Sequence, residues 1–332
     1  SISVEDKDAS IGIEPPEILE LNARHLHTNF KISSEGENLT LYDDNGNKVS
    51  SLNVIGIPAD VSLGFTDDNN IVHFSDPTPG YANSENYFLG SIHSNVLFSN
   101  DGGSFTGEIN VSLSGASEDE QIRYTLDSSE PNESSRLYSN PINIKNTTVV
   151  RTKIFRLGYL PSYTESRAYL YNINHTLPII SLITEPGNLF NNDYGIYVYG
   201  DSYDQNYPHF GANFWEDWER PIHFSLYQNN SNYEVSFNAG IKIFGGWSRG
   251  QAQRSFSIFA RGKYGTQSID YKLFPQLDYS RFQSLILRNS GQDWLKTSVK
   301  DASLTSLLKG TGLDYQSYRP VVTYINGQYW GI

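Results

Sequence analysis

The sequence predicts a mainly β chain that ends in a mixed α+β segment. Its 332 residues include 23 Tyr, 17 Phe and 27 Gly, a composition that favours strands and turns. Short stretches of alternating apolar residues are separated by turn residues, whereas only one stretch has a clear helical pattern. The length exceeds that of one ordinary core, so we expect two or three domains.

Composition also excludes several classes of function. The formal net charge is −13, which disfavours binding to nucleic acid and to anionic lipid. The chain has no Cys, so disulfides and thiolate metal sites are excluded, and it has no apolar run long enough to span a membrane. The absence of Cys fits a secreted or cell-surface bacterial protein, and a cytosolic origin is the alternative. Because Met is absent as well, we expect an internal piece of a longer chain.

Residues 1–90 are predicted to form the first domain. Alternation around Leu39 and Leu41 indicates a strand, and Asn45-Gly46 is predicted to supply two positive φ angles for a tight hairpin. The segment resembles the second half of a bacterial lamin-tail domain, which implies an immunoglobulin-like sandwich. The stretches that carry this resemblance are residues 27–33, 36–37, 58–64 and 77–84.

Residues 91–176 are predicted to form a second sandwich. Residues 122–127 and 148–155 alternate as strands do, and polar turns separate them from their neighbours. The segment resembles the chitobiase/β-hexosaminidase C-terminal type of domain, a module without glycosidase carboxylates. The stretches that carry this resemblance are residues 124–127, 130–131, 137–138, 141–142 and 158–162.

The third predicted domain covers residues 177–332. The continuous apolar run at 177–184 is typical of a buried strand. A helix is predicted from Ser298 to Lys309, capped by Ser298 with Asp301 completing the capping box. Near the end of the sequence, Asn326-Gly327 predicts a tight hairpin.

Within this segment, a long loop at 245–253 joins two alternating stretches. The apolar positions predicted to be buried are Ile241 and Ile243 before the loop, and Phe256, Ile258 and Ala260 after it. Arg254 has the same parity as the second group, so it is predicted to point inward, where an anion would have to meet it. One interpretation is a phosphate-binding loop. The other is an ordinary hairpin, with Trp247 packed on the core and Arg254 paired to a carboxylate.

Several short blocks in residues 177–332 resemble the CotH family, secreted and spore-coat proteins with an atypical protein-kinase fold. The blocks are residues 219–224, 239–250, 253–256, 263–265, 273–275, 287–291 and 326–332. The predicted fold class is therefore two immunoglobulin-like β-sandwich domains followed by a truncated α+β protein-kinase-like domain. The resemblance implies phosphoryl transfer from ATP, with Mg²⁺ or Mn²⁺, to a protein substrate.

The resemblance also implies a set of nucleotide-binding residues: Gly245, Gly246, Ser248, Arg249, Arg254 and Asn289. The family often has Lys where this chain has Arg254, and Arg is not an equivalent replacement. Catalytic acids are expected beyond the block that ends at Ile332. The catalytic residues are therefore unknown, and residues 1–332 alone are predicted not to catalyse the reaction.

The remaining acidic and His residues carry no predicted catalytic or metal site. Residues 215–219 are interpreted as an exposed turn, with a cation site as the alternative. His residues lack the spacing of metal ligands. The acids considered are Asp193, Asp201, Asp204, Glu216 and Asp217, and the His residues are His175, His209 and His223.

A second hypothesis is a non-catalytic surface protein. In it the kinase-like domain is a scaffold, and the sandwiches serve adhesion or contact a surface glycan. A third, a carbohydrate-active enzyme, ranks last because no Asp/Glu pair has a glycosidase pattern.

Overall fold

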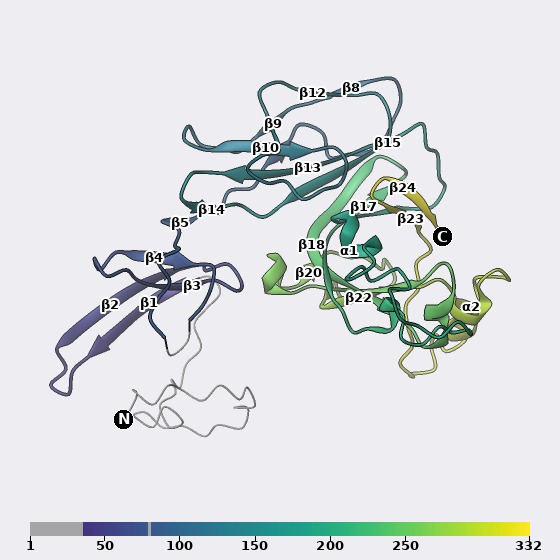
Figure 1. Cartoon of the computed structure of the whole chain (residues 1–332). Helices are drawn as coiled ribbons and strands as arrows, with labels where there is room; N and C mark the ends of the chain where they lie inside the picture. Colours follow the sequence, from purple (N-terminus) through teal and green to yellow (C-terminus); the bar gives the residue numbers. More distant parts are fainter. Residues whose placement is uncertain (1–35, 79–80) are drawn as a thin grey trace. The chain divides into compact units, whose positions relative to one another are not determined.

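The computed structural model describes residues 36–78 and 81–332 (Figure 1). The lamin-tail stretch at 27–33 and part of the stretch at 77–84 lie outside these residues. The described chain forms two compact units. The first contains the residues up to Ser91 together with Leu157–Leu160, and the second contains Ile92–Arg156 and Pro161–Ile332. The predicted division at residues 90 and 176 stays a prediction.

The first unit consists of two-stranded sheets. Their strands are β1 (Gly36–Tyr42) with β2 (Lys48–Ile55), β3 (Ser62–Phe65) with β4 (Ile71–Phe74), and β5 (Gly90–Ser91) with β14 (Tyr159–Leu160). The predicted β1–β2 hairpin is confirmed, but its turn differs from the prediction. Only Gly46 has a positive φ, of 80°, and the strand register shifts between Leu41 and Tyr42. Asp43 explains the difference. Its Oδ1 accepts hydrogen bonds from the amides of Asn45 and Asn47, and these bonds support a wider turn.

The second unit begins with a β-sandwich. One sheet has five strands in the order β11 (Arg136–Leu137), β10 (Gln121–Thr125), β13 (Thr148–Phe155), β15 (Glu165–Tyr171) and β7 (Gly103–Phe105). The two smaller sheets pair β8 (Ile109–Val111) with β12 (Ile142–Ile144), and β6 (Leu97–Phe98) with β9 (Leu113–Ser114). The strands predicted at 122–127 and 148–155 are confirmed as β10 and β13. Alternate residues of these sheets, such as Ile122, Ile144 and Ile154, form the buried layer.

A seven-stranded sheet dominates the rest of the unit, and its long strand β18 is strongly curved (Figure 1). The order is β22 (Ser284–Leu287), β19 (Ser255–Phe259), β18 (Asn232–Phe244), β17 (Arg220–Gln228), β16 (Ile179–Ile183), β23 (Val322–Ile325) and β24 (Gln328–Gly331). Only β16 and β23 pair in parallel. The buried strand predicted at 177–184 is β16, an interior strand of the sheet, and all five residues of β16 are buried.

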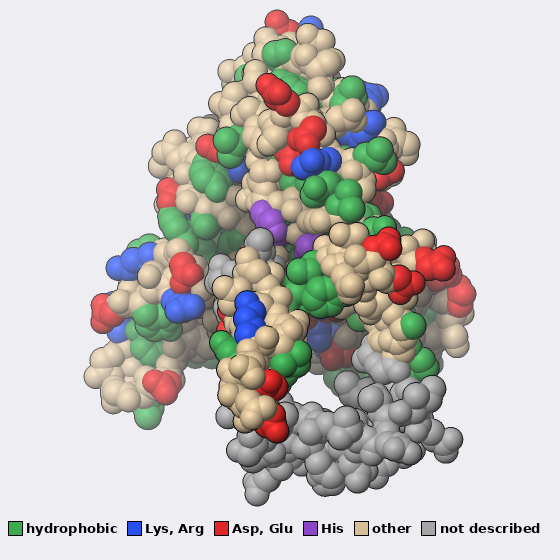
Figure 2. Space-filling model, turned by 90° about the vertical axis from the view of Figure 1, so that its left-hand side faces the viewer, with side chains coloured by type: hydrophobic (Ala, Val, Ile, Leu, Met, Phe, Trp, Pro, Cys, Tyr) green, Lys and Arg blue, Asp and Glu red, His purple; other side chains and the backbone are tan. Residues whose placement is uncertain are grey.

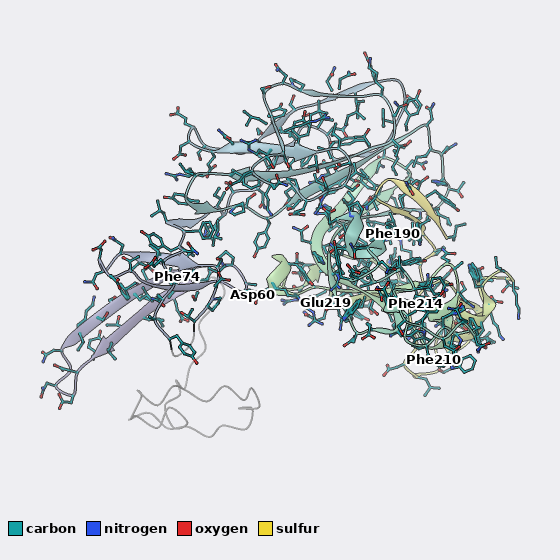
Figure 3. The ribbon with its side chains drawn as sticks, viewed as in Figure 1. Asp60, Phe74, Phe190, Phe210, Phe214 and Glu219 are labelled. Carbon is teal, nitrogen blue, oxygen red and sulfur yellow. The ribbon has the colours of Figure 1, made fainter. Side chains whose placement is uncertain are left out.

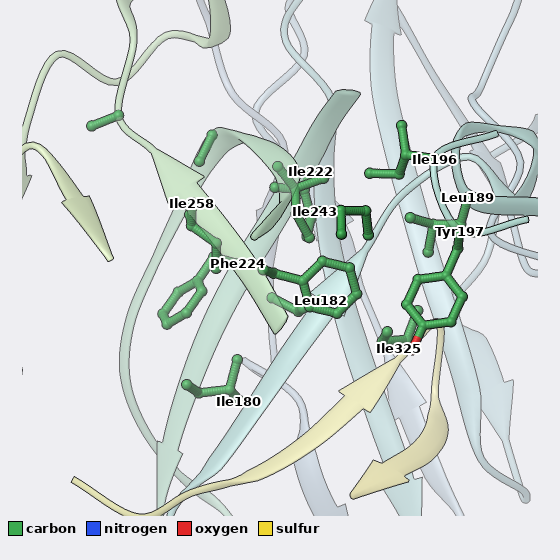
Figure 4. Packing of buried hydrophobic residues seen from close by; sticks show 14 of the residues in the cluster. Ile180, Leu182, Leu189, Ile196, Tyr197, Ile222, Phe224, Ile243, Ile258 and Ile325 are labelled. Atoms are coloured by element: carbon green, nitrogen blue, oxygen red, sulfur yellow. The ribbon is translucent and has the colours of Figure 1, made fainter. Parts of the chain in front are cut away.

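Residues 185–219, which we call the insertion, cover one face of this sheet. The insertion contains α1 (Pro186–Phe190) and the short 3₁₀ turn η2 (Asn213–Trp215). Its Leu189, Ile196 and Phe214 pack into one apolar cluster with the inward side chains of the sheet (Figure 4). Ile241 and Ile243 belong to this cluster, as do Phe256, Ile258 and Ala260, so the predicted parity of β18 and β19 is confirmed.

The sandwich and the large sheet meet through buried polar contacts. Arg167 of β15 lies with its Nη1 3.4 Å from Nε2 of His223 on β17. The Nδ1 atom of His223 is 2.8 Å from Oδ1 of Asn238, and Asn238 in turn donates to the carbonyl of Thr164. The Tyr227 hydroxyl donates to the carbonyl of Asp101. Strands of both sheets therefore share one network within the second unit.

Smaller elements complete the structure. They are the 3₁₀ turns η3 (Trp247–Gly250), η4 (Gly262–Tyr264) and η5 (Gly291–Asp293), the pair β20 (Ile269–Asp270) and β21 (Arg281–Phe282), and α2 (Lys300–Ser306). No helix in the described ranges is long and apolar enough to cross a membrane. The hairpin predicted at Asn326-Gly327 is confirmed, and both residues have the positive φ that its tight turn requires.

The helix predicted from Ser298 to Lys309 is shorter than expected. It begins at Lys300, and Ser298 has a φ of 58°, so it cannot act as the cap. The carboxylate of Asp293 takes that role, because it accepts bonds from the Lys300 amide and the Thr297 hydroxyl. The side chains of Leu304 and Leu307 are 55% and 74% exposed.

Replacing Asp293 with Ala should loosen α2. The Lys300 amide would lose its acceptor, so amide hydrogens of the first turn should exchange about fivefold faster. Replacing Ser298 with Ala is the matched control and should change little. Hydrogen–deuterium exchange measured by mass spectrometry compares the two variants, and equal protection of α2 in both would refute the assignment of the cap to Asp293.

Candidate active site

The loop between β18 and β19 is held closed by its own backbone. Gly245 has a φ of 113°, and a Cβ atom there would lie 2.5 Å from the Ser248 hydroxyl, so glycine is required. The guanidinium of Arg249 folds back on the loop and donates to the Gly245 carbonyl at 2.6 Å. It also donates to the carbonyls of Phe214 and Trp215. The Arg249 guanidinium therefore donates these hydrogen bonds within the protein itself.

Arg254 points inward, as its parity predicted, and is enclosed by the insertion. The side chain is 6% exposed and lies over three aromatic rings, with its guanidinium carbon 3.9 Å from the ring centre of Phe214. The other two rings belong to Tyr197 and Tyr199. Its Nε donates to the carbonyl of Arg249 at 2.7 Å. Burial lowers the pKa of Arg254, although Tyr197 and Tyr199 oppose the shift.

The simple-hairpin interpretation of this loop is wrong in two respects. That interpretation predicted that Trp247 packs on the core, yet the Trp247 side chain is 63% exposed. It also predicted that Arg254 pairs with a carboxylate, yet no carboxylate within the described ranges forms an ion pair with Arg254. Aromatic faces and a carbonyl stabilise the buried cation in place of an anion.

Asn289 lies next to the start of β19, where all its polar atoms are engaged. Its Oδ1 accepts bonds from the Ser255 hydroxyl and the Gly291 amide, and its Nδ2 donates to Gln251 and to the Gln253 carbonyl. The side chain is 4% exposed. Asn289, just after β22, is therefore connected by hydrogen bonds to the loop between β18 and β19.

Five of the six predicted nucleotide-binding residues thus lie in one local structure, and Asn289 borders it. Gly246 is the most exposed of the five, whereas Arg249 and Arg254 direct donors toward protein carbonyls. The guanidinium groups of Arg249 and Arg254 are thus engaged within the protein.

A cation that the sequence analysis missed lies on the opposite face of the sheet. Arg288 follows β22 directly and forms an ion pair with Asp301 in the first turn of α2. Both side chains are close to half exposed, at 46% and 47%. Asp301 was interpreted as part of a capping box, but it turns toward Arg288 instead. A cation at the end of an alternating strand, followed by an acid at a helix start, was the available signal.

This ion pair lines a cavity of about 370 Å³ between β22, α2 and the end of β18. The cavity falls in the size range of small-molecule sites, and it combines many aromatic side chains with few charges. Its aromatic lining residues are Phe244, Phe274, Tyr279, Phe282, Tyr315 and Tyr318.

The acids of residues 215–219 have different surroundings. Glu216 and Asp217 are exposed, and Asp217 pairs with Lys242 at 2.8 Å, as expected of a solvated turn. Glu219 is largely buried and lies within 3.1 Å of both Arg261 and Lys263 (Figure 3). These cations hold the pKa of Glu219 below its usual range against the opposing effect of burial. No group of three His, Asp or Glu side chains in residues 36–78 and 81–332 could hold a metal ion.

Comparison with known families gives two matches. Residues 100–166 match the family model of the chitobiase/β-hexosaminidase C-terminal domain, and residues 241–332 match that of the CotH kinase protein. The chain carries a CotH kinase domain. No curated protein matches the chain in a sequence search. The lamin-tail resemblance of residues 1–90 stays a prediction.

The stretch that matches the CotH family model contains all the residues that line the cavity. This stretch begins at Ile241 in β18 and extends through β19, β22, α2 and the β23–β24 hairpin. Phe244, Arg288 and Asp301 therefore all belong to the CotH kinase domain. The strands β16 and β17, which join its two groups of strands, precede the matched residues.

Proposed function

We propose that this chain is the nucleotide-binding part of a CotH-type protein kinase, and that the cavity beside Arg288 and Asp301 receives the nucleotide. The observation that carries the proposal is the ion pair between the end of β22 and the first turn of α2. In protein kinases, a cation on the third strand of the sheet pairs with an acid on the following helix and holds the ATP phosphates.

The order of elements along the chain supports this comparison. The Gly-containing loop joins β18 to β19, β22 pairs antiparallel with β19, and α2 follows β22. A kinase has the same succession of loop, strand, cation and helical acid. Arg288 can offer a phosphate two parallel N–H groups, where a Lys would offer a point charge.

The cavity fits a nucleotide in size and lining. Its aromatic side chains suit a flat base, and Ser290, Ser298 and Thr305 add hydroxyl groups at its polar edge. ATP would supply the phosphoryl group that is transferred. Asp301 is the one carboxylate among the described residues that line the cavity, so these residues do not by themselves form a complete site for Mg²⁺ or Mn²⁺.

The test is ATP titration of the 332-residue chain by isothermal calorimetry. Replacing Arg288 with Ala should weaken binding at least about tenfold, because a charge-assisted bond contributes roughly 1.5–3 kcal/mol. The matched control is Arg281→Ala. That side chain is 70% exposed and pairs only with Asp270 among the described residues, so its loss should leave ATP affinity unchanged.

Two results would count against the proposal. One is a chain that binds no ATP at millimolar concentration. The other is an equal affinity of the Arg288→Ala and Arg281→Ala variants, which would place the nucleotide elsewhere. Transfer to a protein substrate and a location outside the cell are further proposals, and they rest on the CotH kinase match and on composition.

A further inference from the structure

A cluster of exposed aromatic side chains lies on the outer side of the insertion and the β18–β19 loop. We call it the aromatic face, formed by Tyr207, Phe210, Trp215 and Trp247. Three of its members are about half exposed or more, at 50% for Tyr207, 49% for Phe210 and 63% for Trp247. None of the functions considered above uses these rings.

The aromatic face is fixed in position before any partner arrives. The Tyr207 hydroxyl donates to the Trp247 carbonyl at 2.7 Å, and the Trp215 indole donates to the Pro208 carbonyl at 2.9 Å. The ring centres of Phe210 and Trp215 are 4.7 Å apart, and Phe210 meets Trp247 edge to face at 6.3 Å. Rigid aromatic anchors of this kind supply much of the binding energy at protein interfaces.

The charged side chains around the aromatic face are mostly acidic. Residues 168–219 contain no Lys or Arg, while the insertion alone contains seven acids. Asp201, Asp204 and Glu216 are exposed, and none forms an ion pair within the described part of the chain. One cation, Arg249, stacks on Trp215 and donates to backbone carbonyls, so it is already engaged within the protein. Figure 2 shows acidic and basic side chains interspersed on the surface that it draws.

Exposed rings surrounded by carboxylates favour some classes of binding partner over others. Carboxylates around the rings repel nucleic acid and anionic polysaccharide, and to a neutral sugar they offer hydrogen-bond acceptors but no attraction between opposite charges. A Lys or Arg side chain gains twice, since it can lie over a Tyr or Trp ring and also meet a carboxylate. We propose that the aromatic face, with Asp201, Asp204 and Glu216 around it, docks a Lys- or Arg-bearing segment of a partner polypeptide.

The test measures fluorescence anisotropy of a labelled peptide of alternating Lys and Gly, with the complete chain and without nucleotide. The triple variant Asp201→Asn/Asp204→Asn/Glu216→Gln should bind about tenfold more weakly in low salt, and the difference should shrink in high salt. Phe210→Ser should bind roughly fivefold more weakly at both salt concentrations, because its contribution is not ionic.

Matched controls come from the first unit. The triple variant Asp44→Asn/Asp67→Asn/Asp68→Asn removes the same charge from exposed positions, and Tyr42→Ser removes a ring that is 59% exposed. Both should bind as the unmodified chain does. Circular dichroism melts confirm that each variant is folded, and the charge variants are surface changes that folding should tolerate.

Several outcomes would overturn the proposal. They are absence of binding to the Lys peptide, equal binding to a Glu/Gly peptide, binding of a neutral oligosaccharide that Phe210→Ser abolishes, and equal losses in the control triple variant. Because the assay contains no ATP, failure here leaves the nucleotide proposal standing, and failure of ATP binding leaves this result standing.

Discussion

Replacing Arg254 with Ala is expected to lower the free energy of unfolding of the second unit by about 3 kcal/mol. The buried guanidinium lies over three rings and donates to the Arg249 carbonyl. A desolvated cation–π contact is worth about 2 kcal/mol, and a hydrogen bond from a charged donor adds roughly 1.5 kcal/mol or more. Denaturant unfolding followed by Trp fluorescence measures the change.

Two further variants sharpen this result. Arg254→Lys keeps a cation but loses the planar fork, so an intermediate loss of about 1–2 kcal/mol is expected. Arg281→Ala, at an exposed position, should stay within about 0.5 kcal/mol of the unmodified chain. If Arg254→Ala and Arg281→Ala have the same free energy of unfolding, the enclosure of Arg254 by aromatic rings does not stabilise the fold.

Arg254 also separates the two assignments of the phosphate-binding cation. The sequence-based assignment predicts that Arg254→Ala loses ATP affinity even under conditions where the variant is fully folded. The cavity beside Arg288 predicts that ATP affinity survives in that variant as long as it is folded. Calorimetry of Arg254→Ala and Arg288→Ala side by side therefore decides which guanidinium meets the nucleotide.

The second large effect is a loss of stability in acid caused by His223. Burial lowers the pKa of this imidazole to about 3, and the nearby Arg167 acts in the same direction. The unfolded chain binds a proton at His223 below about pH 6.5, whereas the folded chain does not. The contribution of His223 to stability is therefore constant above pH 6.5. It falls by about 1.4 kcal/mol per pH unit below that, a loss of roughly 4–5 kcal/mol by pH 3.

The His223→Gln variant isolates this contribution, since it removes the titrating ring and keeps a polar side chain. Burial also raises the pKa of Glu165, so Glu165 stabilises the fold at low pH and this contribution is lost as pH rises. The effect is the same in the unmodified protein and in the His223→Gln variant, and it cancels when the two are compared. The difference in unfolding free energy between the two proteins should thus narrow steadily from pH 7 to pH 4. Curves that stay parallel over this range would exclude His223 as the cause.

Local sequence signals predicted much of the fold because their causes are local. Alternation located β10, β13, β18 and β19, and it also predicted that Arg254 points inward. Asn326-Gly327 formed the predicted turn, whereas Asn45-Gly46 did not, because the Asp43 side chain supports a different turn. Identical dipeptides thus gave different turns according to a neighbour two residues away.

The candidate site was harder to predict because its causes are contacts between distant segments. The cap of α2 comes from Asp293 and not from the adjacent Ser298, since the chain before the helix doubles back. The enclosure of Arg254 depends on Tyr197 and Phe214 from the insertion, 57 and 40 positions away in the sequence. Arg288 and Asp301 meet only when α2 lies beside β22.

The strand order of the large sheet has a practical consequence for anyone who cuts this gene into pieces. A fragment starting at Ile241 would sever β18 and discard β17 and β16, so the β19–β22 pair and the β23–β24 hairpin would have no strand between them. A fragment starting at Leu177 would keep the strands but strip Arg167 from His223 and Asp101 from Tyr227. We therefore expect that soluble expression of the kinase-type part requires the preceding sandwich on the same polypeptide.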